Sequence, residues 1–193
     1  AYLDEQRLLW TDGERIVVIN GAGESNNLLE SRTDINAMTI WNGRLWWTEK
    51  TGPKLMSLAL EGGIPEQHFG PPDISNPLFL TLGAANDEGD LPVTIGLESW
   101  PYSGLICRYA IASDRLNCRS HGPPKAQDLM FHGDQLVWST QFGVVKLATR
   151  APYEFIGEPL QPGGFTIEDN RAWLTDRRGG RVLTLDLNEQ EEN

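Results

Sequence analysis

The chain has 193 residues, of which 39% are hydrophobic and 22% charged, as in a folded protein with one substantial core rather than a disordered chain. Acidic residues outnumber basic ones 27 to 16, and the formal charge of −11 argues against nucleic acid or an anionic membrane surface as the main partner. No stretch approaches the ~20 apolar residues that span a bilayer, and no charged-then-apolar leader opens the chain.

One strand-like signature recurs along the chain. It reads RLLWTD at residues 7–12, RLWWTE at 44–49, QLVWST at 135–140 and RAWLTD at 171–176. The first two copies begin 37 positions apart and the last two 36, while the middle interval of 91 is about two periods. A diverged copy is therefore expected in between, and PVTIGLES at 92–99 is the candidate. Five units of about 40 residues then account for the whole chain.

Each unit has the same internal order. An apolar run is followed by a turn, the signature strand, a second turn and a third apolar run, and the first four units add a weaker fourth run. Asn42 and Gly43, between two apolar runs, are a strong hairpin signal. Four antiparallel strands per ~40 residues are typical of a β-propeller blade. The alternative, an ordinary β-sandwich, gives no reason for a near-constant repeat.

The pattern predicts an all-β fold, namely a single β-propeller domain of about five four-stranded antiparallel blades. Its units lie near residues 1–33, 34–73, 74–122, 123–161 and 162–193. Only five residues follow the run at 181–188, and they are too polar for an outer strand, so we expect either a last blade of three strands or a chain cut from a longer protein.

The adjacent tryptophans Trp46 and Trp47 fit this fold. Side chains alternate faces along a strand, and a blade between two neighbours has two buried faces. Trp10 and Trp138 align with Trp47, and Trp173 aligns with Trp46, so all five are expected to pack between blades.

A carboxylate also recurs at one position of the repeat, as Asp12, Glu49 and Asp176. A catalytic group is normally unique in a chain, whereas a group present in several units does work that each unit needs. These three residues are therefore expected to be structural.

The repeats resemble those of known propeller families. LLWTD and LWWTE resemble the LYWTD repeat of low-density-lipoprotein-receptor type propellers, although Leu9, Trp46, Val137 and Trp173 stand where that family has Tyr. GGFTIEDNRAWLTD, residues 163–176, is similar to repeats of NHL and gluconolactonase-like propellers. The receptor-type resemblance implies blade-to-blade hydrogen bonds for the repeated carboxylate, and six blades where five are counted here. The gluconolactonase-like resemblance implies a metal held by Glu, Asn and Asp at the start of the innermost strands, where this chain has Asp34, Asn36, Asn76 and Asp128 but no matching Glu.

The two cysteines, Cys107 and Cys118, lie in the third and fourth runs of the middle unit. A turn centred on Ala112 and Ser113 would place them directly opposite each other, within reach of a disulfide. Two buried free thiols are the alternative. A disulfide favours an oxidising compartment, so a periplasmic or extracellular location is expected, for a mature secreted protein or for the excised part of an anchored one.

Signatures of catalysis are missing. The sequence has no G-x-S-x-G, H-E-x-x-H, phosphate-loop, C-x-x-C or dinucleotide motif, and its three histidines, His68, His121 and His132, are scattered. The run NDEGD at 86–90 resembles a fragment of a calcium loop but lacks the closing Glu, which favours a solvated acidic turn. We therefore expect no enzyme activity, metal or cofactor.

The function that fits best is a non-catalytic binding domain, either a sensor or an assembly domain. Its partner is expected to be a protein, peptide or small ligand that binds on one propeller face. The domain itself is not expected to be embedded in a membrane, although removed segments could have tethered it to one. Trp41, Trp100 and Tyr102 are the candidate binding surface, and core or inter-blade packing is the alternative for each. The alternative functions are a metal-dependent propeller hydrolase or lactonase, and a structural repeat that works only within an oligomer.

Overall fold

The computed structural model describes residues 2–4, 7–12, 14–30, 35–49, 52–69, 77–97, 104–122, 128–133, 135–140, 143–146, 154–156 and 162–187. Within these ranges the regular structure is β-strand, apart from one short 3-10 helix, η1 (Ile111–Ser113). None of the described residues belongs to a helix with the length and apolar character needed to cross a membrane.

The described strands form five antiparallel sheets, and in each sheet the strand order follows the sequence. The first sheet contains β1 (Tyr2–Asp4), β2 (Arg7–Thr11), β3 (Arg15–Asn20) and β4 (Ser25–Glu30), and the second contains β5 (Ile35–Trp41), β6 (Arg44–Glu49), β7 (Leu55–Ala59) and β8 (Glu66–Phe69). The third contains β9 (Pro77–Leu82), β10 (Asp90–Leu97), β11 (Gly104–Ala110) and β12 (Arg115–Gly122). The fourth contains β13 (Leu129–His132), β14 (Gln135–Thr140), β15 (Gly143–Lys146) and β16 (Glu154–Ile156). The fifth contains β17 (Pro162–Glu168), β18 (Arg171–Asp176) and β19 (Arg181–Asp186).

The prediction of an all-β fold built from antiparallel sheets is therefore confirmed. Of the diverged copy of the signature, placed at 92–99 by its spacing, the described residues 92–97 lie in β10, the second strand of its sheet. The expected turn at Asn42 and Gly43 joins β5 to β6, and both residues have positive φ, at 46° and 70°. Such a turn twists in the same sense as the strands that flank it.

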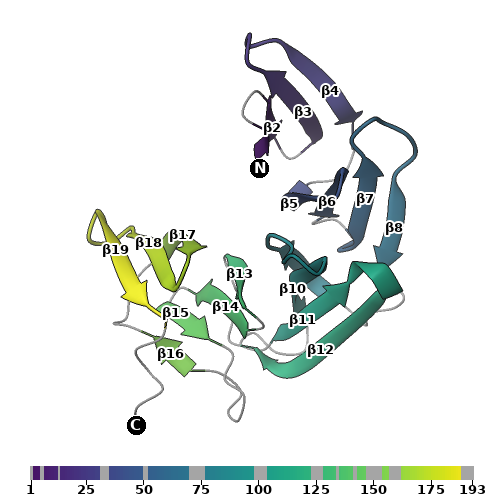
Figure 1. The fold of residues 1–193 in the computed structure, drawn as a ribbon. Coiled ribbons are helices and arrows are strands. Elements are labelled where there is room, and N and C mark those ends of the chain that lie inside the picture. Colours follow the sequence, from purple (N-terminus) through teal and green to yellow (C-terminus); the bar gives the residue numbers. More distant parts are fainter. Residues whose placement is uncertain are drawn as a thin grey trace.

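The five sheets follow one another around an arc in sequence order (Figure 1). The first strand of each sheet lies toward the inside of the arc, and the later strands lie toward its outside (Figure 1). The first and fifth sheets stand at the two ends of the arc. This is the radial arrangement of a propeller, and it places the turns between first and second strands at one end of the disc.

Each junction between neighbouring sheets, here called a seam, contains its own apolar cluster. The seam between the first and second sheets holds Leu9, Ile16, Ile35, Leu45, Trp47, Met56 and Leu58, and the next seam holds Trp46, Leu55, Phe69, Leu80, Leu82, Leu91, Val93, Ile95, Cys107 and Tyr109. The third seam holds Ile106, Leu129, Leu136 and Trp138, and the fourth holds Val137, Ala172, Leu174 and Leu187. The core of the molecule is therefore divided among the seams.

The signature strand shows how a seam is built. In β6 every residue from Leu45 to Glu49 is buried, because sheets pack on both of its faces. In β18 burial alternates strictly, and Trp173 is exposed. Trp10 of β2 is exposed too. The expectation that all five aligned tryptophans pack between sheets therefore fails at these two positions. Each tryptophan stands on a sheet at an end of the arc, on the face that no other described sheet covers.

The disulfide between Cys107 and Cys118 is present. The two residues lie directly opposite each other in β11 and β12, with their Cα atoms 4.0 Å apart. Tyr109 is paired with Leu116, as the register deduced from the sequence requires. Cys107 is buried in a seam while Cys118 is exposed, so the bond ties the outermost strand of the third sheet to its core.

The recurring carboxylates make their contacts within their own sheets. Oδ1 of Asp12 accepts hydrogen bonds from the backbone N–H groups of Glu14 at 3.0 Å and Arg15 at 3.1 Å, and Oδ2 accepts one from Nε of Arg15 at 2.8 Å. These bonds, first among them the one from Glu14, hold the pKa of the Asp12 carboxyl below its usual value. In β18, Asp176 accepts from the backbone N–H of Arg178 at 3.1 Å.

Glu49 forms an ion pair with Lys54 at 3.0 Å. The contacts found for all three carboxylates thus close the turn that follows the signature strand. The resemblance to receptor-type repeats implies bonds between blades, whereas the contacts given above lie within one sheet.

Candidate functional site

A hollow of about 440 Å³ lies where the third and fourth sheets meet at the hairpin end of the disc. Residues 84–88, in the loop between β9 and β10, form one side of it. Met130 and Phe131 of β13, with Gly133 in the following turn, form the other. We call this feature the hairpin hollow. Its size is within the range of small-ligand and side-chain pockets.

The acidic run predicted as a solvated turn forms the rim of the hollow. Oδ1 of the Asn86 side chain accepts a hydrogen bond from the backbone N–H of Asp90 at 2.8 Å. The backbone carbonyl oxygen of Asn86 accepts another from the backbone N–H of Gly89 at 3.0 Å. The loop is closed on itself, and Asp87 and Glu88 are exposed at its tip. Among the described residues that line the hollow, these are the two charged ones, so the rim is negative.

Trp41, one of the candidate binding residues, supports this loop from behind. A Cβ atom at Gly89 would lie 2.5 Å from two carbons of the Trp41 ring, so the ring is packed directly against the glycine backbone. Gly89 has a φ of +84°, a conformation that residues with a side chain rarely adopt. Trp41 is half-buried against the cluster of the second and third sheets and fixes the loop rather than lining the hollow.

The opposite wall of the hollow is apolar, and the Arg108 guanidinium packs against its Phe131 ring. The guanidinium carbon of Arg108 lies 5.1 Å from the centre of the Phe131 ring, and Nη1 of Arg108 forms an ion pair with Asp90 at 3.3 Å. Arg108 therefore connects the β13 wall to the base of the acidic loop. A neighbouring bond between Nε2 of His132 and Oδ1 of Asn170, at 3.0 Å, links the hairpin turns of the fourth and fifth sheets.

The other sequence-predicted positions are placed as follows. Trp100 and Tyr102 lie outside the described residues, as do Asp34 and Asn76. Of the remaining positions implied by the gluconolactonase-like resemblance, Asn36 is exposed and donates to the carbonyl oxygen of Leu80, and Asp128 is half-buried. Over the described part of the chain, no group of three or more His, Cys, Asp or Glu side chains is placed to hold a metal ion.

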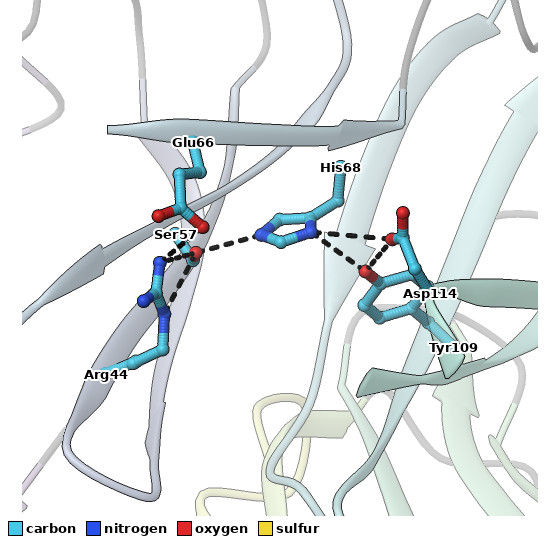
Figure 2. A network of polar contacts seen from close by, with 6 residues as sticks. All are labelled: Arg44, Ser57, Glu66, His68, Tyr109 and Asp114. Atoms are coloured by element: carbon cyan, nitrogen blue, oxygen red, sulfur yellow. Dashed lines mark hydrogen bonds and ion pairs between the residues drawn. The ribbon is translucent and has the colours of Figure 1, made fainter. Parts of the chain in front are cut away.

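A second polar feature crosses the seam between the second and third sheets (Figure 2). Oγ of Ser57 lies 2.9 Å from Nε2 of His68, and Nδ1 of the same ring lies 2.9 Å from the hydroxyl of Tyr109 and 3.5 Å from Oδ1 of Asp114. Tyr109 donates its hydroxyl proton to Asp114. We call this set, which Figure 2 shows as a chain of contacts from β7 through β8 to β11, the seam network.

Two further charges complete the network on the side of the second sheet. Nε and Nη2 of Arg44 both donate to Oγ of Ser57, at 3.3 and 2.8 Å, and Nη2 also contacts Glu66 at 2.8 Å. Since Ser57 already accepts from Arg44, its own proton is directed to Nε2 of His68. Since Tyr109 donates to Asp114, Nδ1 of His68 carries a proton and donates to Tyr109. The network is thus fully bonded when His68 is neutral.

The surroundings of His68 favour this neutral form. Its ring lies 4.6 Å from the Trp46 ring, centre to centre, and 5.8 Å from that of Tyr109. Burial lowers the pKa of His68 below its usual value, although Asp114 opposes the shift. Burial likewise raises the pKa of Tyr109, with a further contribution from Asp114. Both rings are therefore uncharged at neutral pH.

Ser57, His68 and Asp114 occur in the order of a catalytic triad, but Ser57 is fully buried and its oxygen accepts hydrogen bonds from Arg44. The network connects the second sheet to the third. Sequence reasoning missed it because its members are drawn from two repeat units, and His68 and Tyr109 are 41 positions apart. The one available signal was a histidine in an outer strand of otherwise ordinary pattern.

Comparison with solved structures places the chain among β-propeller proteins. It is similar to a candidate gluconolactonase, with 17% identity and a TM-score of 0.66 over 96% of this chain and 75% of that one. A candidate TolB from Agrobacterium tumefaciens matches with 13% identity and a TM-score of 0.65, over 93% of this chain and 76% of that one. YCF48 bound to the D1 peptide matches with 13% identity and a TM-score of 0.60, over 95% and 62%. No family model and no curated protein matches the sequence.

Proposed function

We propose that this chain is a non-catalytic, five-bladed propeller domain that binds a cationic peptide or protein segment in the hairpin hollow. The observation that carries the proposal is the hollow itself, which combines an apolar wall, Met130 and Phe131, with an acidic rim, Asp87 and Glu88. A Lys or Arg side chain suits both surfaces, because its methylene stem packs on apolar groups while its charge faces carboxylates.

The charge of the whole molecule favours the same class of ligand. A formal charge of −11 attracts cations and repels polyanions over distances of about a Debye length. The carboxylates at the rim are exposed, so their attraction is screened by salt and each contributes little alone. Binding is therefore expected to weaken markedly as salt is added.

We further propose that the domain works outside the cytoplasm, in the periplasm or the extracellular space. The Cys107–Cys118 disulfide supports this location, since such bonds persist in oxidising compartments. One propeller of similar fold has a compatible location. The extracellular domain of BT4673 from B. thetaiotaomicron matches with a TM-score of 0.55 and 12% identity, over 96% of this chain and 32% of that one.

The binding proposal is tested by calorimetric titration with the peptide acetyl-Lys-Leu-Arg-Lys-amide, at low and at high salt. The double variant Asp87→Asn/Glu88→Gln should weaken binding by several-fold at low salt. The control double variant Glu14→Gln/Glu61→Gln removes the same total charge from exposed positions away from the hollow and should bind as the parent does. Equal losses in the two double variants, or no loss in either, would show that the hollow is not the binding site.

The non-catalytic part of the proposal has its own measurement. Elemental analysis of the purified protein should find no stoichiometric divalent metal, and calcium should not raise the midpoint of thermal unfolding. A bound metal together with lactone hydrolysis would instead establish the metal-dependent hydrolase.

A further inference from the structure

An arginine of the chain itself shows what the walls of the hairpin hollow can hold. The guanidinium carbon of Arg108 lies 5.1 Å from the centre of the Phe131 ring, within the range of a cation–π contact. Nη1 of the same side chain lies 3.3 Å from Oδ2 of Asp90, at the base of the acidic loop. One guanidinium therefore contacts the aromatic wall and a carboxylate next to the loop at the same time.

The same two kinds of group line the hollow. Phe131 stands on one side of it, and Asp87 and Glu88 stand on the other. Phe131 is half-buried and both carboxylates are exposed, so all three are accessible to a ligand. The volume of about 440 Å³ is sufficient for a long side chain. The hollow therefore offers a ligand the combination of ring and carboxylate that Arg108 already uses within the chain.

We infer that the hairpin hollow selects arginine over lysine, and that Phe131 is the residue that determines this specificity. The inference rests on the proposed function, since it names the cationic side chain that the hollow takes. The guanidinium plane of the ligand lies against the Phe131 ring, and its N–H groups donate to Asp87 or Glu88.

Arginine and lysine differ in the properties that these walls distinguish. The guanidinium is planar, is more weakly hydrated than an ammonium and stacks on aromatic rings. Its fork of N–H groups also fits a carboxylate through two parallel hydrogen bonds. The lysine ammonium is a compact, strongly hydrated charge, so it loses more solvation against a ring and has no plane to stack on it. The acidic rim attracts both cations, and the ring adds the preference for arginine.

The charge of Arg108 does not prevent a second cation from approaching Phe131. Arg108 is paired with Asp90, whose side chain is only 13% exposed, so its charge is largely balanced. A partly buried pair of this kind is also screened less by salt than a pair in open solvent, so it persists when salt is added. The repulsion that is left reduces the preference for arginine, which is therefore expected to be several-fold.

The test measures selectivity with two peptides of equal charge. Calorimetric titration compares acetyl-Arg-Leu-Arg-Arg-amide with acetyl-Lys-Leu-Lys-Lys-amide, and the parent chain should bind the arginine peptide several-fold more tightly. A third peptide carries citrulline in place of each arginine, which keeps the planar group and removes the charge. It should bind much more weakly than the arginine peptide, because the acidic rim no longer attracts it.

Variants of the two apolar wall residues then locate the selectivity. Phe131→Leu should bind the arginine and lysine peptides with similar affinity, whereas Phe131→Tyr keeps an aromatic face and should keep the preference. Met130→Leu is the matched control in the same wall and should also keep it. If Phe131 had only a structural role, Phe131→Leu would weaken both peptides in proportion and leave the ratio of their affinities unchanged.

The possible failures are distinguishable. Equal affinity of the parent chain for the arginine and lysine peptides would overturn the inference, and the hollow would then bind cations without selecting between them. A preference that persists in Phe131→Leu, or a citrulline peptide that binds as tightly as the arginine peptide, would also overturn it. A parent chain that binds neither cationic peptide would overturn the proposed function itself, and the inference with it.

Discussion

Trp46 and Trp47 are neighbours in the sequence, yet they are buried in two different seams. Trp46 packs among residues of the third sheet, including Leu91 and Tyr109, whereas Trp47 packs with Leu9 and Ile16 of the first sheet. One strand thereby fixes the second sheet to both of its neighbours. A pair of aromatic residues that could be taken for a ligand surface is in this chain the centre of the core.

This relationship predicts a large and specific difference in stability. Trp46→Ala and Trp47→Ala should each lower the free energy of unfolding by about 3–5 kcal/mol, the usual cost of removing a buried aromatic side chain. Trp10→Ala and Trp173→Ala are matched controls at the same repeat positions and should cost less than ~1 kcal/mol in the isolated chain, because these rings are exposed. Urea unfolding measures all four. Similar losses at all four positions would contradict the difference in burial between the two pairs of tryptophans.

The disulfide predicts a loss of stability on reduction. Cys107 and Cys118 are separated by 11 positions, and closing a loop of this length should stabilise the fold by about 2–3 kcal/mol. The Cys107→Ala/Cys118→Ala variant should therefore unfold at lower urea than the parent, and a reducing agent should shift the parent to the same midpoint. The double variant itself should not respond to the reducing agent. A parent that is insensitive to reduction would show that the bond contributes nothing to stability.

The features that could be predicted from sequence are local in the chain. The strand order, the Asn42–Gly43 hairpin and the register that joins Cys107 to Cys118 each depend on residues within one repeat unit. The hairpin hollow could be foreseen only in part, because the acidic turn was identified but its apolar wall comes from the next unit.

The features that could not be predicted depend on which sheet faces which. Trp10 and Trp47 hold the same repeat position, but one is exposed and the other buried, because burial is decided by the neighbouring sheet rather than by the strand itself. The seam network has the same origin, since Ser57 and His68 meet Tyr109 only across a seam. No local pattern records that contact.

The seam network predicts a pH dependence of stability. The groups that face His68 are Ser57, Arg44 and Glu66 from its own sheet, and Tyr109 and Asp114 from the third. The pKa of His68 is lowered in the folded state, so folding favours the neutral ring. Its contribution is then complete above the unfolded pKa of about 6.5 and is lost as the pH falls from there through the folded value. The slope from one proton is at most about 1.4 kcal/mol per pH unit.

Urea unfolding measured from about pH 8 to about pH 5, on both sides of about 6.5, should therefore show a free energy of unfolding that falls at the acidic end. His68→Gln should remove that part of the pH dependence. His132→Gln, which replaces a histidine that contacts Asn170 of the fifth sheet instead of the seam network, is measured in parallel. A His68→Gln profile parallel to that of the parent would mean that His68 does not titrate differently in the folded and unfolded states.

The packing of Trp41 on Gly89 predicts that the acidic loop tolerates no side chain at that glycine. Gly89→Ala introduces two costs, a positive φ of 84° and a clash with the Trp41 ring at 2.5 Å. Gly23→Ala isolates the first cost, because Gly23 has a φ of 81° and nothing within 4 Å of the added carbon. The left-handed backbone should cost about 1–2 kcal/mol of unfolding free energy in both variants.

Gly89→Ala should cost roughly a further 1–3 kcal/mol, because the added methyl group overpacks the contact with the Trp41 ring. In a Trp41→Leu background the same Gly89→Ala change should cost less than it does in the parent, because the smaller leucine leaves room for the methyl group. This cost is the difference in unfolding free energy between Trp41→Leu and the double variant. Equal losses in Gly89→Ala and Gly23→Ala would show that Trp41 does not hold the loop.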